Sequence, residues 1–297
     1  LDNTTLPDWD VALVFGNHDA FFTASPLGVK NSPYKKQGSP DVRVLKQLEA
    51  AKYINVSYKC MDVPEQSVSI IGGRPFSWGG PHWKHGPFFQ RVCGVTSLEH
   101  SELRINKAID SAQHHSSIVF LAHSGPSGLG SRPESICGKD FGSEPEGDWG
   151  DVDLRKSIEH ARKAGRRVPL VVFGHMHRKL NRLFEDMERV MLVSEPDVSA
   201  DAEKISFDDA NTPKTVMLNT AVVPRILPDL HNRSNPRFNN PNLHHFNMVV
   251  FIHDKVAIVY ECWVSSIGQI QNVKVMYHDD KVCSLEQVQR DRTELLS

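Results

Sequence analysis

The sequence predicts an α/β protein: a four-layer α/β/β/α sandwich in which two mixed sheets pack together and helices cover their outer faces. Short apolar runs alternate with helical patterns over the first two thirds of the chain, as in α/β proteins. The last third contains closely spaced runs that are typical of strands. The 297 residues, of which 39% are hydrophobic, suffice for one large core. We therefore expect a single domain over residues 1–297.

The first strand is expected at Val11–Phe15, a continuous apolar run ending at Gly16, which is the pattern of a strand buried on both faces. Similar runs predict strands over residues 67–73, 117–122, 168–173, 190–193, 215–219, 246–253 and 255–262. Polar loops are expected at 195–213 and 228–245. The irregular stretch 74–94, with its Gly, Pro, Trp and His residues, predicts a structured loop or lid.

Helices are predicted where apolar residues recur at helical spacing. The first covers residues 41–53, with an apolar stripe at Val42, Leu45, Leu48 and Ala51. A second opens at Ser97, and a third covers 151–164 and stops at Gly165.

Composition excludes several classes of protein. The formal net charge of −2 shows no basic surplus for binding nucleic acid. No apolar run approaches the roughly 20 residues of a membrane helix, so we expect no membrane partner. The five cysteines form no C-x-x-C pair and are expected to be free thiols of a reducing, intracellular compartment. The chain begins at Leu1 rather than Met, which suggests that it is truncated or processed.

Candidate site residues follow three of the expected strands. Gly16-Asn17-His18-Asp19 comes directly after the first strand, where open α/β sheets place their sites. Asn17 offers a carbonyl oxygen to a metal ion, His18 is a candidate proton donor, and Asp19 is a candidate to orient His18. The alternative is that this turn only caps the following segment.

The motif Gly174-His175-Met176-His177 follows another strand, and two histidines at i and i+2 after a glycine can bind a metal ion together. His123 lies where a third strand meets a Gly-rich loop. By itself it favours a structural histidine. Because the carboxyl ends of parallel strands share one edge of a sheet, the three clusters together favour a shared site.

Other residues have weaker claims. Trp78, Trp83, His82 and His85 are either a substrate entrance or packing of the loop onto the core, and packing is favoured. Surface positions are expected for His114, His115, His244 and His245. Arg225 is equally compatible with a phosphate contact and a structural salt bridge. Ser124 and Ser127 lack the G-x-S-x-G elbow of a serine hydrolase.

G-N-H-D and G-H-x-H, in this order with a lone histidine between them, resemble the calcineurin-like metallophosphoesterase superfamily over about residues 11–220. Residues 16–21 and 218–225 resemble a subgroup of plants and cyanobacteria, which implies a plastid or cytosolic location. The resemblance implies a hydrolase of phosphoric ester bonds that uses a metal-activated hydroxide. Its cofactors would be two divalent metal ions, with Mn, Fe or Zn suiting the mixed N/O ligands.

The resemblance also implies individual roles. Asn17, His123 and His175 would bind one metal ion and His177 the other. His18 would face the phosphate, and Asp19 would orient it.

The chain departs from the family pattern at its start. The family's D-x-H and G-D-x-x-D motifs precede G-N-H-D, and neither occurs among residues 1–15; Asp8 and Asp10 do not follow an apolar strand. We therefore expect a domain that lacks its N-terminal strands and first two metal motifs, and weak or absent turnover from these 297 residues. The alternative is a non-catalytic scaffold or binding protein. A mononuclear structural zinc site is less favoured, because such sites usually use cysteine.

Overall fold

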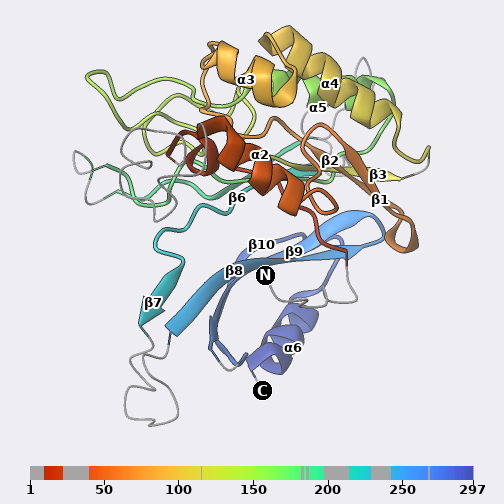
Figure 1. Ribbon diagram of the computed structural model, residues 1–297. Coiled ribbons are helices and arrows are strands. Elements are labelled where there is room, and N and C mark those ends of the chain that lie inside the picture. Colours follow the sequence, from red (N-terminus) through yellow and green to blue (C-terminus); the bar gives the residue numbers. More distant parts are fainter. Residues whose placement is uncertain are drawn as a thin grey trace.

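The computed structural model describes residues 10–22, 40–114, 116–181, 184, 187–196, 214–228, 242–266 and 268–296. They form a six-stranded mixed sheet in the order β1-β2-β3-β4-β6-β5 and a four-stranded sheet in the order β10-β9-β8-β7 (Figure 1). The predicted α/β architecture with two sheets is confirmed. The second sheet was expected to be mixed, but its four described strands all pair antiparallel.

The strands of the first sheet are β1 (Cys60–Val63), β2 (Val68–Gly72), β3 (Ser117–Leu121), β4 (Leu170–Phe173), β5 (Leu192–Pro196) and β6 (Lys214–Asn219). Those of the second are β7 (Ile226–Pro228), β8 (Asn242–Ile252), β9 (Lys255–Ser265) and β10 (Ile270–His278). The helices are η1 (His18–Phe22), α2 (Pro40–Ala50), η2 (Pro64–Gln66), α3 (Gly86–Cys93), α4 (Leu98–Asp110), α5 (Val152–Lys163) and α6 (Leu285–Leu296).

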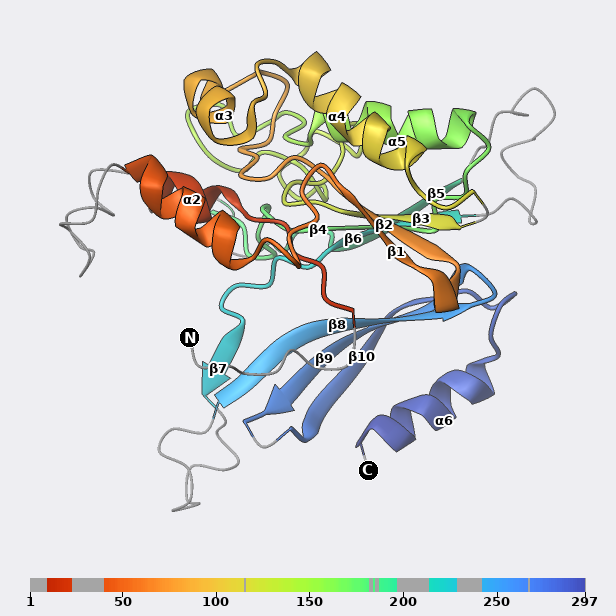
Figure 2. The same ribbon diagram turned by 45° about the vertical axis from the view of Figure 1, so that its right-hand side comes forward.

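Four layers are visible in Figure 2, from the helices α3, α4 and α5 through both sheets to α6. Ile105 and Ile158 of the upper helices pack with Phe120 of β3. Val216 of β6 and Val259 of β9 pack between the sheets. A third cluster joins β9 and β10 to α6. Each sheet therefore buries both faces, which explains the nearly continuous apolar runs of its central strands.

The centre of the first sheet is parallel: β2, β3, β4 and β6 run side by side in the same direction, and β1 and β5 form antiparallel edges. The predicted strands at 67–73, 117–122, 168–173 and 215–219 correspond to these four parallel strands. Because they are parallel, the segments that follow β3 and β4 emerge at the same edge of the sheet, where a site can form.

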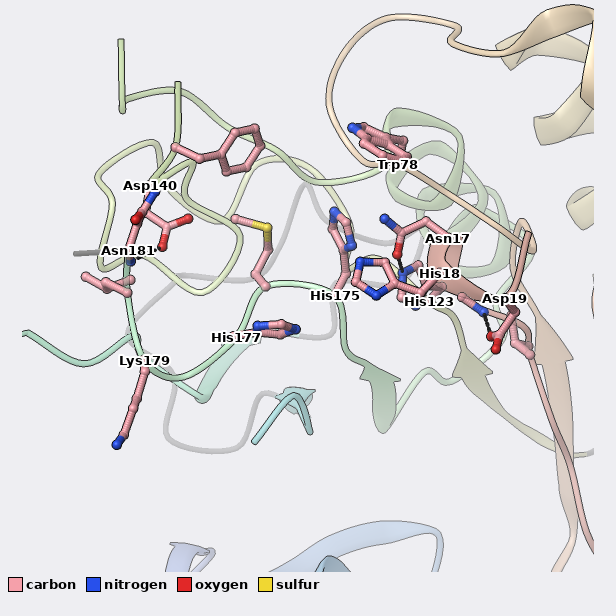
Figure 3. Close-up of a pocket in the computed structure, with 15 residues that line it drawn as sticks. Asn17, His18, Asp19, Trp78, His123, Asp140, His175, His177, Lys179 and Asn181 are labelled. Atoms are coloured by element: carbon pink, nitrogen blue, oxygen red, sulfur yellow. Dashed lines mark hydrogen bonds between the residues drawn. The ribbon is translucent and has the colours of Figure 1, made fainter. Parts of the chain in front are cut away.

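The predicted strand Val11–Phe15 is wrong. This half-buried segment joins no sheet and forms one isolated parallel bridge, between Leu13 and Asn55. Leu13 exchanges backbone hydrogen bonds with residues 54 and 56, and the carbonyl of Phe15 accepts from the amide of Phe76 at 2.8 Å. Loop backbone therefore satisfies its polar groups where a strand neighbour was expected. The segment still delivers Gly16–Asp19 to the edge where β3 and β4 end (Figure 3).

Two further expectations need correction. The irregular stretch 74–94 contains α3, whose Phe88 and Phe89 are buried. Helix α2 does not bury the stripe that contains Val42 and Leu45, which are 37% and 47% exposed; it buries Val44 completely. Val44 packs in a cluster with Phe76, Phe88 and Phe89, so the position of the 74–94 segment decides which face of α2 is covered.

The predicted helices at 97 and 151–164 are confirmed as α4 and α5. Ser97 caps α4, its side chain accepting from the amide of His100. Strands β1, β7 and β10 and helix α6 were not predicted. The expected loops lie largely outside the described residues, although 242–245 belong to β8. None of the described helices combines the length and hydrophobicity that crossing a bilayer requires.

Candidate metal centre

The three sequence clusters meet at one pocket of about 780 Å³ (Figure 3). Asn17, His18, His123, His175 and His177 all line it. They come from the start of η1 and from the loops after β3 and β4. The structure thus brings all the predicted site residues to one edge of the first sheet, Asp19 included.

Asn17 and His123 face one another directly. Asn17 is buried, and its Oδ1 lies 2.8 Å from Nε2 of His123. The close approach depends on Gly16, because a Cβ added there would lie 2.7 Å from Cε1 of His123. The glycine of the G-N-H-D motif therefore has a packing role: it leaves room for an imidazole from another strand end.

His175 and His177 leave β4 through a tight turn. His175 has a φ of +68°, in the left-handed region. The amide of Gly174 donates to the carbonyl of His123 at 2.9 Å, which ties the two strand ends together. The rings of His123 and His175 lie edge to face with centroids 4.9 Å apart. The backbone thus sets the two imidazoles side by side at the pocket floor.

The pocket favours neutral imidazoles. Burial, followed by the neighbouring histidines, lowers the pKa of His123 well below its ordinary value. Burial also lowers the pKa of His175 to about 4, although a hydrogen bond with the backbone of Trp78 acts in the opposite direction. The pKa of His177 is lowered, again chiefly by burial. Since a metal ion binds imidazole only in its neutral form, these pKa shifts are compatible with coordination.

The G-N-H-D turn places His18 and Asp19 differently. His18 is exposed and lies near His123 in the pocket (Figure 3). The Oδ2 atom of Asp19 accepts a hydrogen bond of 2.7 Å from the amide of Gly16, which closes the turn. The role of Asp19 in orienting His18 stays a prediction.

Arg189, which the sequence reading missed, organises the loops around the pocket. Its buried guanidinium donates to the carbonyls of His177, Pro133, Ser135 and Gly138, at 2.6–2.9 Å. It also pairs with Asp140 at 3.2 Å. No local pattern could reveal this role, because the acceptors are mostly backbone carbonyls.

A second anchor ties the His175–His177 turn to the second sheet. Arg178 pairs with Glu261 of β9 at 2.6 Å. Glu261 also lies 3.0 Å from Nε2 of His245, which was expected at the surface but is buried against Trp263. The position of Arg178 directly after the G-H-x-H motif was the signal available in the sequence.

The weaker candidates from the sequence differ in their exposure and in whether they line the pocket. Trp83 packs on Phe89, as favoured, while Trp78 lines the pocket. His82, His85, His114 and His244 are exposed, and His115 lies outside the described residues. Ser124 is buried and Ser127 partly buried.

A second cavity of about 520 Å³ reaches His123, His175 and His177 from between the segment 12–14 and the ends of β3, β4 and β6. Arg225, which is exposed, lies on its wall.

The donor types suit a first-row dication: two neutral imidazoles beside a buried amide oxygen, with His177 at the rim. Across the described part of the chain, however, no three or more His, Cys, Asp or Glu side chains are grouped so that they could hold a metal ion. The acidic residues on the pocket wall are Asp19 and Asp140, and each is engaged, by the amide of Gly16 and by Arg189. Two imidazoles and an amide oxygen are thus at most a partial ligand set for one ion, and both carboxylates of the pocket wall are engaged elsewhere.

Comparison with known proteins adds no family: no family model, no curated protein and no solved structure matches the chain.

Proposed function

We propose that this protein is a metal-dependent hydrolase of phosphoric ester bonds. The observation that carries the proposal is that Asn17, His123, His175 and His177, from three separate segments, line one pocket, with His18 beside them. Clusters of ligand-type and titratable side chains in a concave site are typical of catalytic centres. The resemblance of the two motifs to metallophosphoesterases points to phosphate esters as substrates.

In this proposal Asn17, His123, His175 and His177 would hold the bound metal. Bound dications supply Lewis-acid stabilisation of the phosphoryl oxygens. The chain's own contribution is to keep His123 and His175 neutral through burial, so that their lone pairs are free at neutral pH. Gly16 and the Gly174–His123 backbone bond fix the spacing of these ligands.

His18 is the proposed proton donor. It lies at the pocket surface rather than in its floor, so a bound ester can reach it. As the P–O bond to the leaving group breaks and water adds to phosphorus, His18 would give its proton to the departing oxygen. A positioned general acid contributes roughly 10²–10⁴-fold to such a step.

A non-catalytic binding or scaffold protein is the second candidate. It is favoured by one observation, that the acidic residues of the pocket wall are engaged by other groups and leave no carboxylate to bridge two ions. Two dications without such a bridge repel one another, which lowers the affinity for the second. For the 297 residues alone we therefore expect little turnover.

Metal content per chain, measured by elemental analysis after equilibration with Zn²⁺, Mn²⁺ or Fe²⁺, separates the two candidates. The enzyme predicts at least one tightly held ion, lost in His123→Ala and His175→Ala. His244→Ala is the matched control, since this histidine is exposed on β8 and does not line the pocket. If the parent chain holds no ion tightly, the scaffold becomes the favoured candidate in place of the enzyme.

Hydrolysis of phenyl phosphate with each added metal is the second measurement. Metal-dependent turnover that disappears in His175→Ala supports the hydrolase. Robust turnover would contradict the expectation that the missing carboxylate leaves this chain weakly active.

A further inference from the structure

An aromatic rim adjoins the histidine pocket on the side of the 74–94 segment. Trp78, labelled in Figure 3, and Phe141 both line the pocket itself. Trp149 connects them: its Nε1 donates to the carbonyl of Trp78 at 2.9 Å, and its ring meets Phe141 edge to face at 5.1 Å. His175 shares a hydrogen bond with the backbone of Trp78, so the rim is joined directly to the candidate metal centre.

Two lysines lie on this rim. The Nζ of Lys84 lies 4.1 Å from the centroid of the Trp149 ring, and the Nζ of Lys139 lies 5.5 Å from the same centroid. Lys139 is also 5.9 Å from the ring of Phe141. Within the described residues neither lysine forms an ion pair. Two like charges therefore share one indole without a carboxylate between them.

The rim is closely packed around Trp149. A Cβ added to Gly80 would meet the Trp149 indole at 3.2 Å, and one added to Gly79 would meet its carbonyl at 2.4 Å, so the loop backbone lies directly against this residue. The pKa of Lys84 is lowered, first by burial and then by the charge of Lys139, which agrees with their proximity. An anion placed between the two ammonium groups would relieve this repulsion.

The nearby carboxylates do not neutralise Lys84 and Lys139. Asp140 follows Lys139, but it pairs with Arg189 at 3.2 Å and accepts from the amide of Asn181 at 2.9 Å. Asp148, next to Trp149, accepts from the amides of Gly128 and Gly150. Both carboxylates are thus committed to backbone and guanidinium donors, and within the described residues neither of them pairs with Lys84 or Lys139.

We propose that this rim selects the substrate: the pocket takes phosphate esters whose leaving group carries an aromatic ring and a second anionic group. The ring lies against Trp78 and Phe141, and the second anion lies between Lys84 and Lys139. This proposal rests on the proposed phosphoesterase function. A pocket of about 780 Å³ is in the range of sites for small molecules, which favours a small ester over a macromolecule.

Four synthetic esters test the two features separately: propyl phosphate, propane-1,3-diyl bisphosphate, phenyl phosphate and benzene-1,4-diyl bisphosphate. We expect kcat/KM to be highest for the last. In the Lys84→Ala/Lys139→Ala double variant, kcat/KM for the aromatic bisphosphate should fall about tenfold or more, since charge-assisted hydrogen bonds are lost. Phenyl phosphate should stay within about twofold. Phe141→Leu should lower kcat/KM for both aromatic esters and leave kcat/KM for both propyl esters unchanged.

The matched control is Lys255→Ala, an exposed lysine at the start of β9 that does not line the pocket. Equal losses for mono- and bisphosphates in the double variant would overturn the proposal, because they would show only a general charge effect.

Calorimetric titration with benzene-1,4-diyl bisphosphate keeps the subsite testable if no ester is hydrolysed. Affinity that falls in the double variant and not in Lys255→Ala supports the subsite while the hydrolase fails. Equal affinity in the parent chain and the double variant overturns the subsite whatever the turnover.

Discussion

Two polar clusters, the Arg74 network and the histidine pocket, differ in the partners that their side chains have. In the first, Arg74 after β2 pairs with Asp151 at 2.6 Å and Asp153 at 3.1 Å, and all three are buried. Ser77 donates to Asp151, and Ser101 to Asp153. In the second, the histidine pocket, Asn17 contacts His123, His175 shares a hydrogen bond with the backbone of Trp78, and these side chains line an open cavity. The first cluster is held together by ion pairs among buried groups, whereas the second lines a cavity with imidazole and amide side chains.

Burial shifts the pKa values in the two clusters in opposite directions. Burial raises the pKa of Asp151 to about 7, with the guanidinium of Arg74 opposing it. Burial lowers the pKa of His175 to about 4. Each shift disfavours the charged form. The network compensates with an ion pair and is therefore structural, while the pocket keeps its imidazoles neutral, the form that a metal ion needs.

Arg74→Met should have the largest effect on stability. It leaves Asp151 and Asp153 buried near one another without a cation, and breaking a buried ion pair costs about 3–5 kcal/mol. Urea unfolding at pH 7 measures the free energy. A decrease of less than about 1 kcal/mol in the free energy of unfolding would show that the Arg74 network contributes no more to stability than the pocket does.

Glu261→Gln tests the anchor that supports the pocket from the second sheet. Burial raises the pKa of Glu261, but hydrogen bonds from His245 and Arg178 outweigh it and hold the pKa at about 2. A carboxyl with a lowered pKa stabilises the fold fully above its unfolded value of about 4.5 and loses that contribution as the pH falls toward 2.

The contribution at stake is about 3 kcal/mol. We expect Glu261→Gln to be less stable than the parent chain at pH 7, with the difference shrinking below pH 4. Urea unfolding at pH 7, 5, 4 and 3 gives both profiles. A constant difference at every pH would mean that the charge of Glu261 is not what anchors Arg178.

Asn17→Ala should cost less than either change. It removes one neutral hydrogen bond to His123, worth about 1 kcal/mol. The same variant should bind Zn²⁺ at least about tenfold more weakly, since it deletes a proposed ligand. Urea unfolding measures the change in stability, and zinc titration measures the change in affinity. An unchanged zinc affinity would remove Asn17 from the proposed ligands.

Much of the pocket could be predicted because its residues follow short apolar runs, and a parallel sheet brings such positions to one edge. The same reasoning failed for Val11–Phe15, since hydrophobicity reports burial and not the identity of the hydrogen-bonding neighbour. Similarly, the pattern of α2 predicted a helix correctly, but the 74–94 segment decides that Val44 rather than Leu45 is covered.

Side chains whose partners lie far along the chain were beyond prediction. His245 is buried because it lies diagonally across β8 and β9 from Glu261, a relation set by the strand register. Arg189 binds carbonyls that any sequence would offer. The rim lysines belong to this group as well, since Trp149 brings together residues from positions 84 and 139.

His18→Gln should have the smallest effect on stability and separates the clusters most clearly. His18 is exposed, and exposed substitutions usually change the free energy of unfolding by less than about 0.5 kcal/mol. If His18 protonates the leaving group, metal-dependent turnover of phenyl phosphate should nevertheless fall by about 10²-fold or more, because glutamine cannot donate a proton in its place. Metal content should not change, since His18 is not a proposed ligand. Turnover that survives this substitution would assign the proton transfer elsewhere, and a large loss of stability would place His18 with the structural cluster around Arg74.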